Sequence, residues 1–369
     1  MARTTQVALN RTPLYRQLIT QLRDEIARDY RPGQRFGSQN QLARRFGVSP
    51  LTVREAVGAL VQEGLIERRL GSGTFVLDPT ARKVIGVLTE LDITRPTTSF
   101  YFLRLVHSLQ DFFARQGFRV QLYVGQSSPL TGQAPELPTC RAFWEDLEQG
   151  RIRGLVVVGT SQSDRFRQRL RESGVPMVSD VIPGACGMLD YGDMTRQGVR
   201  HLLEAGRRRL ALIYHGTDEG PDRVWHAFAD ELAQSGVAAC PAWVGRVCVG
   251  RAHDSGRAAF RAVWQADATK PDGLLVMDDV LYRDLAQMLL VNRIAVHEDL
   301  LVVATTNAGD PQPFIPDPVR LEVDPDRCAQ TLGRNLLARL DRPDAELTGM
   351  PVPARLRADV AVPAESLLV

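Results

Sequence analysis

The sequence predicts an α/β fold in two parts, a small helical head followed by a larger body of doubly wound parallel sheets. The first 78 residues contain short helical patterns and a glycine-rich hairpin, whereas the remainder alternates continuous apolar runs with helical stretches. Such runs are typical of parallel strands that helices cover on both faces. A chain of 369 residues has room for two or three domains of ordinary size.

Charge differs between the two parts. Residues 1–78 carry 12 Arg and 7 Asp or Glu, a surplus of 5, so the rest of this chain of net charge +2 is about 3 units negative. Basic charge gathered in the head indicates a polyanionic partner there. The sequence lacks the run of about 18 apolar residues that would predict a membrane span and the apolar core of a secretory signal. We therefore expect a cytoplasmic protein.

The cysteine and histidine positions predict neither a metal site nor a disulfide framework. The five cysteines, at positions 140, 186, 240, 248 and 328, form no Cys-x-x-Cys pair. The six histidines show no metal-ligand spacing, and the chain has neither a Gly-x-Ser-x-Gly elbow nor a Walker lysine. Neither Lys83 nor Lys270 is well placed for Schiff-base chemistry. We predict no cofactor and no enzyme activity.

Helical spacing predicts the first two helices of the head. The second covers residues 39–46, between an N-cap at Ser38 and a left-handed C-terminal residue at Gly47. The first starts near Pro13, a residue suited to a first helical turn, and its apolar residues at helical spacing are Leu14, Leu18, Leu22 and Ile26.

A third helix and a hairpin follow. The helix has an N-cap at Ser49 and Pro50 at its first position. Residues 65–69 and 74–77 are strand candidates, and the glycine-rich tip between them needs positive φ. Two short helices followed by such a hairpin predict a winged helix-turn-helix, which places the start of one helix in a DNA major groove.

The head resembles the GntR-type winged helices. The resemblance implies that Asn40, Thr52, Arg54 and the wing at residues 71–73 contact operator DNA. The matching motifs are Pro13-Leu-Tyr-x-Gln-Leu, Pro32-Gly, Leu42-Ala-x-x-Phe-Gly-Val-Ser, Thr52-Val-Arg-Glu-Ala, Leu60-x-x-Glu-Gly-Leu-Ile and Gly71-Ser-Gly-Thr-Phe-Val. With the flanking arginines and the helix start included, the predicted DNA-binding residues are Asn40, Arg44, Arg45, Ser49, Pro50, Thr52, Arg54, Arg68, Arg69, Gly71, Ser72 and Gly73.

Three positions depart from the GntR pattern. Gly37 stands in place of the usual Pro, Gln39 in place of Glu, and Pro50 in place of a frequent Arg. The missing Arg removes a bidentate guanine contact that is worth roughly 1–3 kcal/mol of discrimination. One alternative also stays open, since the arginines at positions 44, 45, 68 and 69 could be ordinary solvated charges rather than phosphate contacts.

The body begins after a linker at residues 79–82 and is expected to alternate strands with helices. One helix is expected over residues 102–116, and the Pro-, Ser- and Gly-rich residues 126–140 are expected to form a surface loop. Small molecules bind at the carboxyl ends of such strands or between two lobes. The strand candidates are residues 84–88, 119–124, 154–159, 175–178, 209–214, 273–277 and 300–304.

The body resembles the LacI/GalR-type effector domain, which is itself similar to periplasmic sugar-binding proteins. The motifs that carry the resemblance are Gly174-Val-Pro-Met-Val, Asp190 followed by residues 198–213, Pro271-Asp-Gly-Leu-Leu-Val-Met-Asp-Asp and Glu298-Asp-Leu-Leu-Val-Val-Ala. The resemblance implies two lobes within residues 83–369, joined by crossovers near residues 189, 320 and 350. The first lobe would comprise about 83–188 and 321–349, and the second about 189–320 and 350–365.

The resemblance places an effector pocket in the loops after the strands. Asp278 stands where the family has Asn, and Thr306-Asn307 where it has Asp-Asp or Asp-Asn. Asp190 and Asp278 could instead be helix caps, the aromatic residues could be core, and Arg223 could serve the surface or bridge the lobes. The predicted effector-binding residues are Phe100, Tyr101, Thr160, Asp190, Arg223, Trp225, Asp278 and Asn307.

These features together predict a ligand-controlled transcriptional repressor. A dimer would place two wings on palindromic double-stranded operator DNA, and a sugar or sugar derivative would act as the effector. The resemblance implies a bacterial, nucleoid-associated protein. Two alternatives are a constitutive DNA-binding dimer with a vestigial sensor, which the substitutions around the pocket favour, and a carbohydrate-binding enzyme on the same scaffold, which the missing catalytic motifs disfavour.

Overall fold

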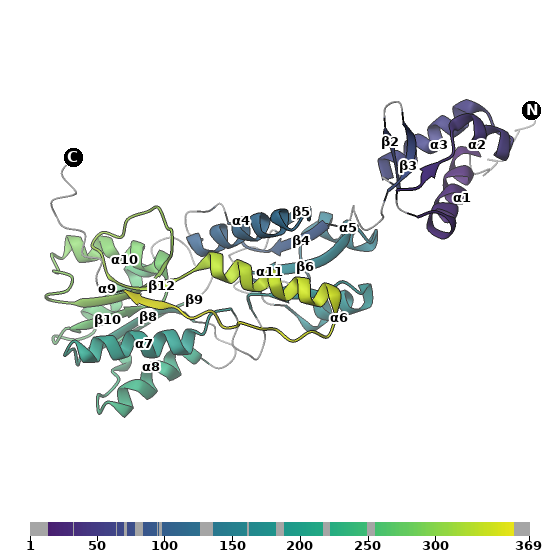
Figure 1. Ribbon diagram of the computed structural model, residues 1–369. Helices are drawn as coiled ribbons and strands as arrows, with labels where there is room; N and C mark the ends of the chain where they lie inside the picture. Colours follow the sequence, from purple (N-terminus) through teal and green to yellow (C-terminus); the bar gives the residue numbers. More distant parts are fainter. Residues whose placement is uncertain are drawn as a thin grey trace, which may run out of the picture. The chain divides into compact units, whose positions relative to one another are not determined.

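The chain divides into two compact units, Met1–Lys83 and Val84–Val369 (Figure 1). The computed structural model describes residues 14–31, 33–63, 65–69, 72–77, 84–93, 95, 98–125, 136–160, 162–181, 188–216, 222–248 and 255–357. Within these ranges, no helix combines the length and apolar character that crossing a bilayer requires.

The first unit has three helices and a small antiparallel sheet among its described residues. The helices are α1 (Leu14–Asp29), α2 (Gln39–Phe46) and α3 (Pro50–Glu63), and the strands are β1 (Arg35–Phe36), β2 (Ile66–Arg69) and β3 (Gly73–Val76). The strands lie in the order β1-β3-β2. Leu22, Val53, Leu60 and Ile66 are fully buried where the helices meet the sheet. The winged helix-turn-helix architecture is confirmed.

Local sequence signals set the ends of α2 as predicted. The Ser38 hydroxyl accepts a hydrogen bond from the Gln41 N–H, and the Gln41 side chain accepts one from the Ser38 N–H, which completes a capping box. Gly47 ends the helix with a φ of 62°, in the left-handed region that favours glycine. In α1, Leu18, Leu22 and Ile26 are buried as expected, but Leu14 is 65% exposed because the helix begins there.

The second unit contains a four-stranded parallel sheet in the order β5-β4-β6-β7. Its strands are β4 (Val84–Thr89), β5 (Val120–Val124), β6 (Ile152–Val158) and β7 (Met177–Ser179). Successive residues of β6 pack on opposite faces: Val156 and Val158 join the core under α4 (Phe100–Arg115) and α11 (Pro325–Asp341), whereas Leu155 and Val157 join the core under α5 (Arg141–Glu148) and α6 (Asp164–Ser173). We call this sheet and its four helices the first lobe.

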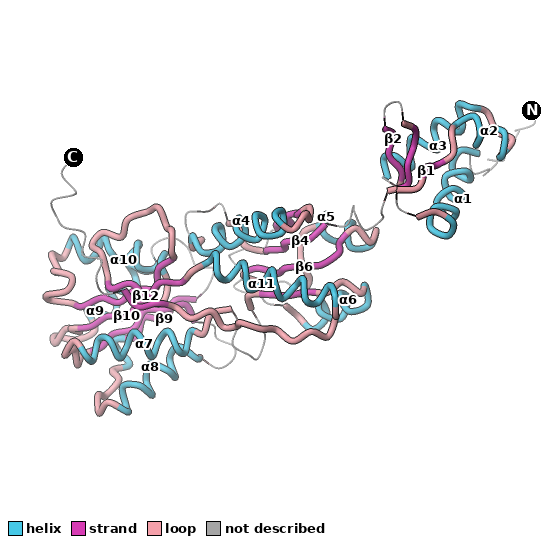
Figure 2. Tube along the Cα trace, in the orientation of Figure 1, coloured by secondary structure: helices cyan, strands magenta, loops and turns pink. Residues whose placement is uncertain are grey.

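A six-stranded sheet in the order β13-β12-β11-β10-β8-β9 forms the second lobe (Figure 2). It is parallel except for the edge strand β13. The helices α7 (Tyr191–Glu204) and α8 (Arg223–Gln234) contribute to the core on one face, and α9 (Ser255–Gln265) and α10 (Asp279–Val291) to the core on the other. Its strands are β8 (Leu210–Gly216), β9 (Val244–Cys248), β10 (Gly273–Val276), β11 (Leu301–Asn307), β12 (Val319–Val323) and β13 (Arg355–Arg357).

The chain passes between the lobes three times: after β7, after β12 and after α11. Two of these crossovers contact each other, since the Val352 N–H donates to the Met188 carbonyl over 2.8 Å. The expected second crossover near residue 320 falls inside β12. Residues 321–323 pair with β11 and therefore belong to the second lobe rather than the first.

Candidate DNA interface and effector site

The start of α3 is held by hydroxyl groups. The Ser49 hydroxyl accepts from the Thr52 N–H over 3.1 Å and lies 2.8 Å from the Thr52 hydroxyl. The Ser49 carbonyl accepts from the Val53 N–H over 3.1 Å, which begins the helical ladder. Ser49 therefore caps α3 as predicted, and the first two turns present the side chains of Pro50, Leu51 and Arg54 at the surface.

Most predicted DNA-binding residues lie at the surface of the first unit. Thr52 and Gly73 are half-buried, and Gly71 lies outside the described residues. The exposed ones are Asn40, Arg44, Arg45, Ser49, Pro50, Arg54, Arg68, Arg69 and Ser72.

The arginines of this surface differ in their partners. Arg45 is paired over 2.6 Å with the buried Glu25, and Arg69 over 2.6 Å with Glu67. Arg69 also stacks on Phe75, 4.6 Å from the ring centroid. Arg44, Arg54 and Arg68 form no ion pair with another described residue, so their charge is available to a phosphate.

Arg44 and Arg45 are neighbours with different expected effects on folding. Arg45→Ala leaves the Glu25 carboxylate buried without its cation, so we expect the first unit to lose about 2–3 kcal/mol of stability. Arg44→Ala, the matched control, removes an exposed side chain and should stay within about 0.5 kcal/mol of wild type. Urea unfolding followed by circular dichroism measures both. Equal stabilities would show that the Glu25 pair contributes nothing.

In the second unit, acidic N-caps gather at the carboxyl ends of the second sheet's strands. The Asp190 carboxylate accepts from the Asp193 N–H over 3.0 Å at the start of α7, and Asp278 accepts from the Leu281 N–H over 2.9 Å at the start of α10. Asp222 caps α8 in the same way. Asp190 and Asp278 are therefore helix caps, as the alternative interpretation held. Each cap uses one carboxylate oxygen, and a carboxylate can accept further hydrogen bonds.

The other predicted effector-binding residues fall into two groups. Tyr101, Thr160 and Asn307 are buried, and the Thr160 hydroxyl is engaged by the Glu90 N–H over 3.0 Å and the Val158 carbonyl over 3.1 Å. Phe100 and Trp225 are half-buried and Arg223 is exposed. Phe100 and Tyr101 lie in the first turn of α4 rather than in the expected loop, because Ser99 caps the helix before them.

Ser99 joins the two lobes. Its hydroxyl accepts from the Tyr101 N–H over 3.2 Å within the first lobe, and from the Asn307 side-chain amide over 3.3 Å across the lobes. The Ser99 hydroxyl also lowers the pKa of the Asp279 carboxyl in the second lobe. Ser99 therefore accepts one hydrogen bond within the first lobe and one from the second.

Asp279 is a buried carboxylate held by a cation. Burial and the neighbouring Asp278 raise its pKa to about 6, against the opposing effects of Ser99 and Arg283. Arg283 lies 3.1 Å from Asp279 and 2.6 Å from Asp310, and stacks on Phe314 at 4.2 Å from the ring centroid. Arg283 therefore balances the negative charge of two carboxylates beside the interlobe contact.

His215 and Tyr191 add accessible groups that the sequence analysis missed. The His215 Nε2 lies 3.7 Å from the Asp278 carboxylate. Burial opposes protonation of the imidazole, but the Asp278 carboxylate outweighs it and the pKa of His215 is raised. The surrounding protein and the carboxylates of Asp278 and Asp180 raise the pKa of Tyr191, although this ring is 45% exposed. His215 lies at the end of β8 and Tyr191 at the start of α7, on the same edge of the sheet. Their positions after a strand and at a helix start could have identified them from the sequence.

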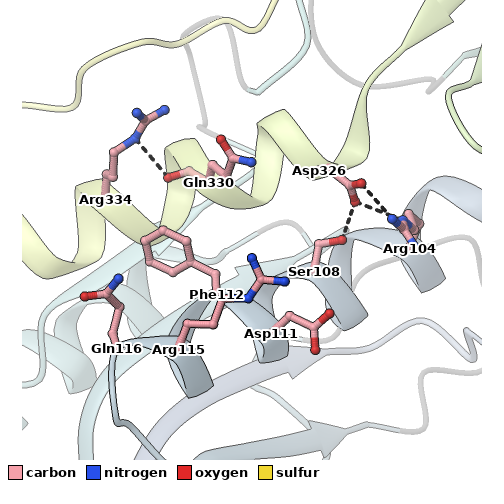
Figure 3. A pocket seen from close by; sticks show the side chains of 9 residues that line it. All are labelled: Arg104, Ser108, Asp111, Phe112, Arg115, Gln116, Asp326, Gln330 and Arg334. Atoms are coloured by element: carbon pink, nitrogen blue, oxygen red, sulfur yellow. Dashed lines mark hydrogen bonds and ion pairs between the residues drawn. The ribbon is translucent and has the colours of Figure 1, made fainter.

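A separate groove of about 360 Å³ lies between α4 and α11 (Figure 3). Arg104 forms a two-pronged pair with Asp326 over 2.9 and 2.7 Å, and Ser108 donates to the same carboxylate. Arg115 and Arg334 line its other end. None of the predicted effector-binding residues lines this groove.

In the part of the chain that the structure describes, no three His, Cys, Asp or Glu side chains are grouped so that they could hold a metal ion. Cys140, Cys240 and Cys328 are free thiols.

Comparison with known proteins matches each unit to a family. Residues 14–76 match bacterial regulatory proteins of the gntR family, and residues 199–358 match the periplasmic binding protein-like domain. The arabinose metabolism transcriptional repressor of Halalkalibacterium halodurans is 25% identical over 289 residues, which cover 74% of this chain and 74% of that protein.

Solved structures share the fold. The complex of the transcriptional regulator CelR with cellobiose has a TM-score of 0.61 at 18% identity, covering 87% of this chain and 98% of that one. A regulatory protein of the LacI family from Chloroflexus aggregans has a TM-score of 0.61 at 14% identity, covering 73% of this chain and 96% of that one. The chain therefore joins a helix-turn-helix domain that matches the gntR family at residues 14–76 to a body that shares the fold of a LacI-family regulator and matches the periplasmic binding protein-like domain at residues 199–358.

Proposed function

We propose that this protein is a transcriptional repressor that binds operator DNA through its first unit and responds to a sugar-class effector held between the two lobes. The observation that carries the proposal is the N-terminal part of α3, where Arg54 is exposed and without an acidic partner among the described residues, in a domain that matches the gntR family. The relative involved in arabinose metabolism and the cellobiose complex support a sugar as the effector.

The proposed arrangement is a cytoplasmic homodimer at the nucleoid. Two heads related by twofold symmetry present two recognition helices to the half-sites of a palindromic operator. An effector that binds one arrangement of the lobes better than another shifts the population of DNA-binding-competent dimers. Phe100, Asp190, Arg223, Trp225 and Asp278 would contact the effector, and the buried Tyr101, Thr160 and Asn307 would support them.

A salt titration of operator binding tests the DNA half. Protein that contacts phosphates releases counterions, so the logarithm of affinity should fall linearly with the logarithm of salt concentration. Arg54→Ala should weaken binding by about 1–3 kcal/mol per half-site. Arg171→Ala is the matched control, because it removes the same charge from an exposed position on α6 of the second unit. Affinity that stays constant from low to high salt would contradict phosphate-led binding.

A thermal-shift screen with pentoses, hexoses and disaccharides tests the effector half. A sugar at 100 times its Kd should stabilise the folded protein by about 2.7 kcal/mol. Asp278→Asn and Trp225→Ala should reduce the shift. Since the Asn307 side chain is already bonded to Ser99, the constitutive regulator with a vestigial sensor is the second candidate. A screen in which no sugar raises the melting temperature would favour it.

The interlobe contact at Ser99 gives a prediction that needs no ligand. Ser99→Ala removes a helix cap and the hydrogen bond from Asn307 between the lobes, which is worth about 0.5–1.5 kcal/mol. Ser163→Ala is the matched control, since Ser163 caps α6 and donates to the Glu136 carbonyl within the first lobe. We expect amide hydrogen exchange at residues 305–307 to speed up about tenfold in Ser99→Ala and to stay unchanged in Ser163→Ala. Equal exchange in both variants would show that the contact does not hold the lobes.

A further inference from the structure

The recognition helix begins with an apolar surface. Leu51 is 56% exposed, and Pro50 before it is exposed as well. In the described part of the first unit, Leu14 and Leu51 are the large apolar residues with more than half of their surface exposed. Leu51 stands one position into α3, beside the predicted DNA contacts Pro50 and Thr52.

The polar groups beside Leu51 are bonded to one another. The Ser49 hydroxyl accepts from the Thr52 N–H, and the two hydroxyls of Ser49 and Thr52 are bonded to each other over 2.8 Å. These bonds hold the helix start together. The first turn also offers an incoming surface the aliphatic Leu51 and Pro50, and the next turn adds the exposed guanidinium of Arg54, which has no ion-pair partner among the described residues.

Charge complementarity selects DNA as the occupant of this surface. Arg44, Arg54 and Arg68 are exposed and form no ion pair with another described residue, which favours a polyanion over an apolar protein face. In the major groove, the apolar group that a base presents is the C5-methyl of thymine. An arginine at position 50 would have favoured guanine, whereas proline followed by an exposed leucine favours a methyl group.

We propose that Leu51 reads the C5-methyl group of one thymine in each operator half-site. The inference rests on the proposed operator binding. Leu51 makes no phosphate contact in this arrangement, so it contributes to sequence selection and leaves the salt dependence of binding to the arginines.

Deoxyuridine substitution tests the inference with the full-length protein. A binding site is first selected from a random duplex library, and each thymine in it is then replaced singly by deoxyuridine, which pairs identically but lacks the methyl group. We expect one position per half-site to lose about fourfold in affinity, and replacement in both half-sites to lose about 15-fold. Leu51→Ala should bind the thymine and uracil duplexes equally, and Leu51→Met should retain the preference.

The outcomes separate the two proposals. Failure to select any DNA site would overturn operator binding itself. Selection of a site whose affinity is insensitive to every uracil replacement would overturn the role of Leu51 and leave operator binding intact. The role would also be wrong if Leu51→Ala weakened binding to all duplexes equally with the uracil penalty unchanged. Because Leu51 is largely exposed, its variants should keep the wild-type melting temperature. An unchanged melting temperature would show that a loss of affinity is not caused by unfolding.

Discussion

Arg283→Ala is expected to destabilise the second unit by about 3–5 kcal/mol, because it leaves two buried carboxylates without their cation. The side chains of Asp279 and Asp310 are each 3% exposed, and both bond to the Arg283 guanidinium, over 3.1 and 2.6 Å. The substitution also removes the stacking contact with Phe314. Urea unfolding monitored by circular dichroism measures the loss.

Two controls identify the unpaired charges as the cause. Arg283→Ala combined with Asp310→Asn removes one of the two unpaired carboxylates, so the double variant should be more stable than Arg283→Ala alone. Arg283→Ala should also lose less stability at pH 5 than at pH 8, because a buried carboxylate without a cation takes up a proton at a higher pH. A loss that is the same at both pH values and unchanged by Asp310→Asn would point to packing on Phe314 instead.

Asp180 is expected to make the second unit less stable as pH rises. Burial raises the pKa of this carboxyl from 3.8 to about 7, even though the Gly159 N–H donates to both of its oxygens at 2.8 and 3.0 Å. Between these two pKa values the folded state binds more protons than the unfolded state, so the free energy of unfolding falls with rising pH. Asp180 therefore lowers the free energy of unfolding by roughly 4 kcal/mol in total as the pH rises from 3.8 to 7.

Asp180→Asn should remove this slope. The variant cannot ionise, so its stability relative to wild type should improve by roughly 3 kcal/mol from pH 5 to pH 8. Asp164→Asn serves as control, because that carboxylate lies at the surface with its side chain 96% exposed. Chemical unfolding at the two pH values gives the comparison. Parallel pH profiles for Asp180→Asn and wild type would mean that Asp180 titrates normally in the folded protein.

Local signals in the sequence predicted the head and the central strands. Ser38, Gly47 and Ser49 act on their own helix ends, so their roles are visible without tertiary structure. The strands that the analysis missed were mostly edge strands or strands with alternating polarity. In β12 the burial alternates along Val319–Val323, and β9 and β13 close the two edges of their sheet. Edge strands need no continuous apolar run, because one side faces no neighbouring strand.

The interlobe contacts could not be predicted from local patterns. Asn307 and Ser99 are 208 residues apart in the chain, and only the meeting of two separate sheets brings them together. The sequence identified Asn307 and Asp278 because they follow strands, but it could not show that Asn307 bonds to Ser99 or that Asp278 faces His215. The position of a strand end is a local property, whereas the partner across the lobes depends on the complete fold.

The split first lobe imposes an order on biosynthesis. The second lobe, apart from its β13 edge, is one uninterrupted stretch of chain from α7 to β12, whereas the first lobe takes α11 from beyond that stretch. Domains fold as units while the chain leaves the ribosome, N-terminal ones first. The head can therefore fold early, but the face of the first lobe's sheet that α11 covers stays open until the chain has been translated through α11.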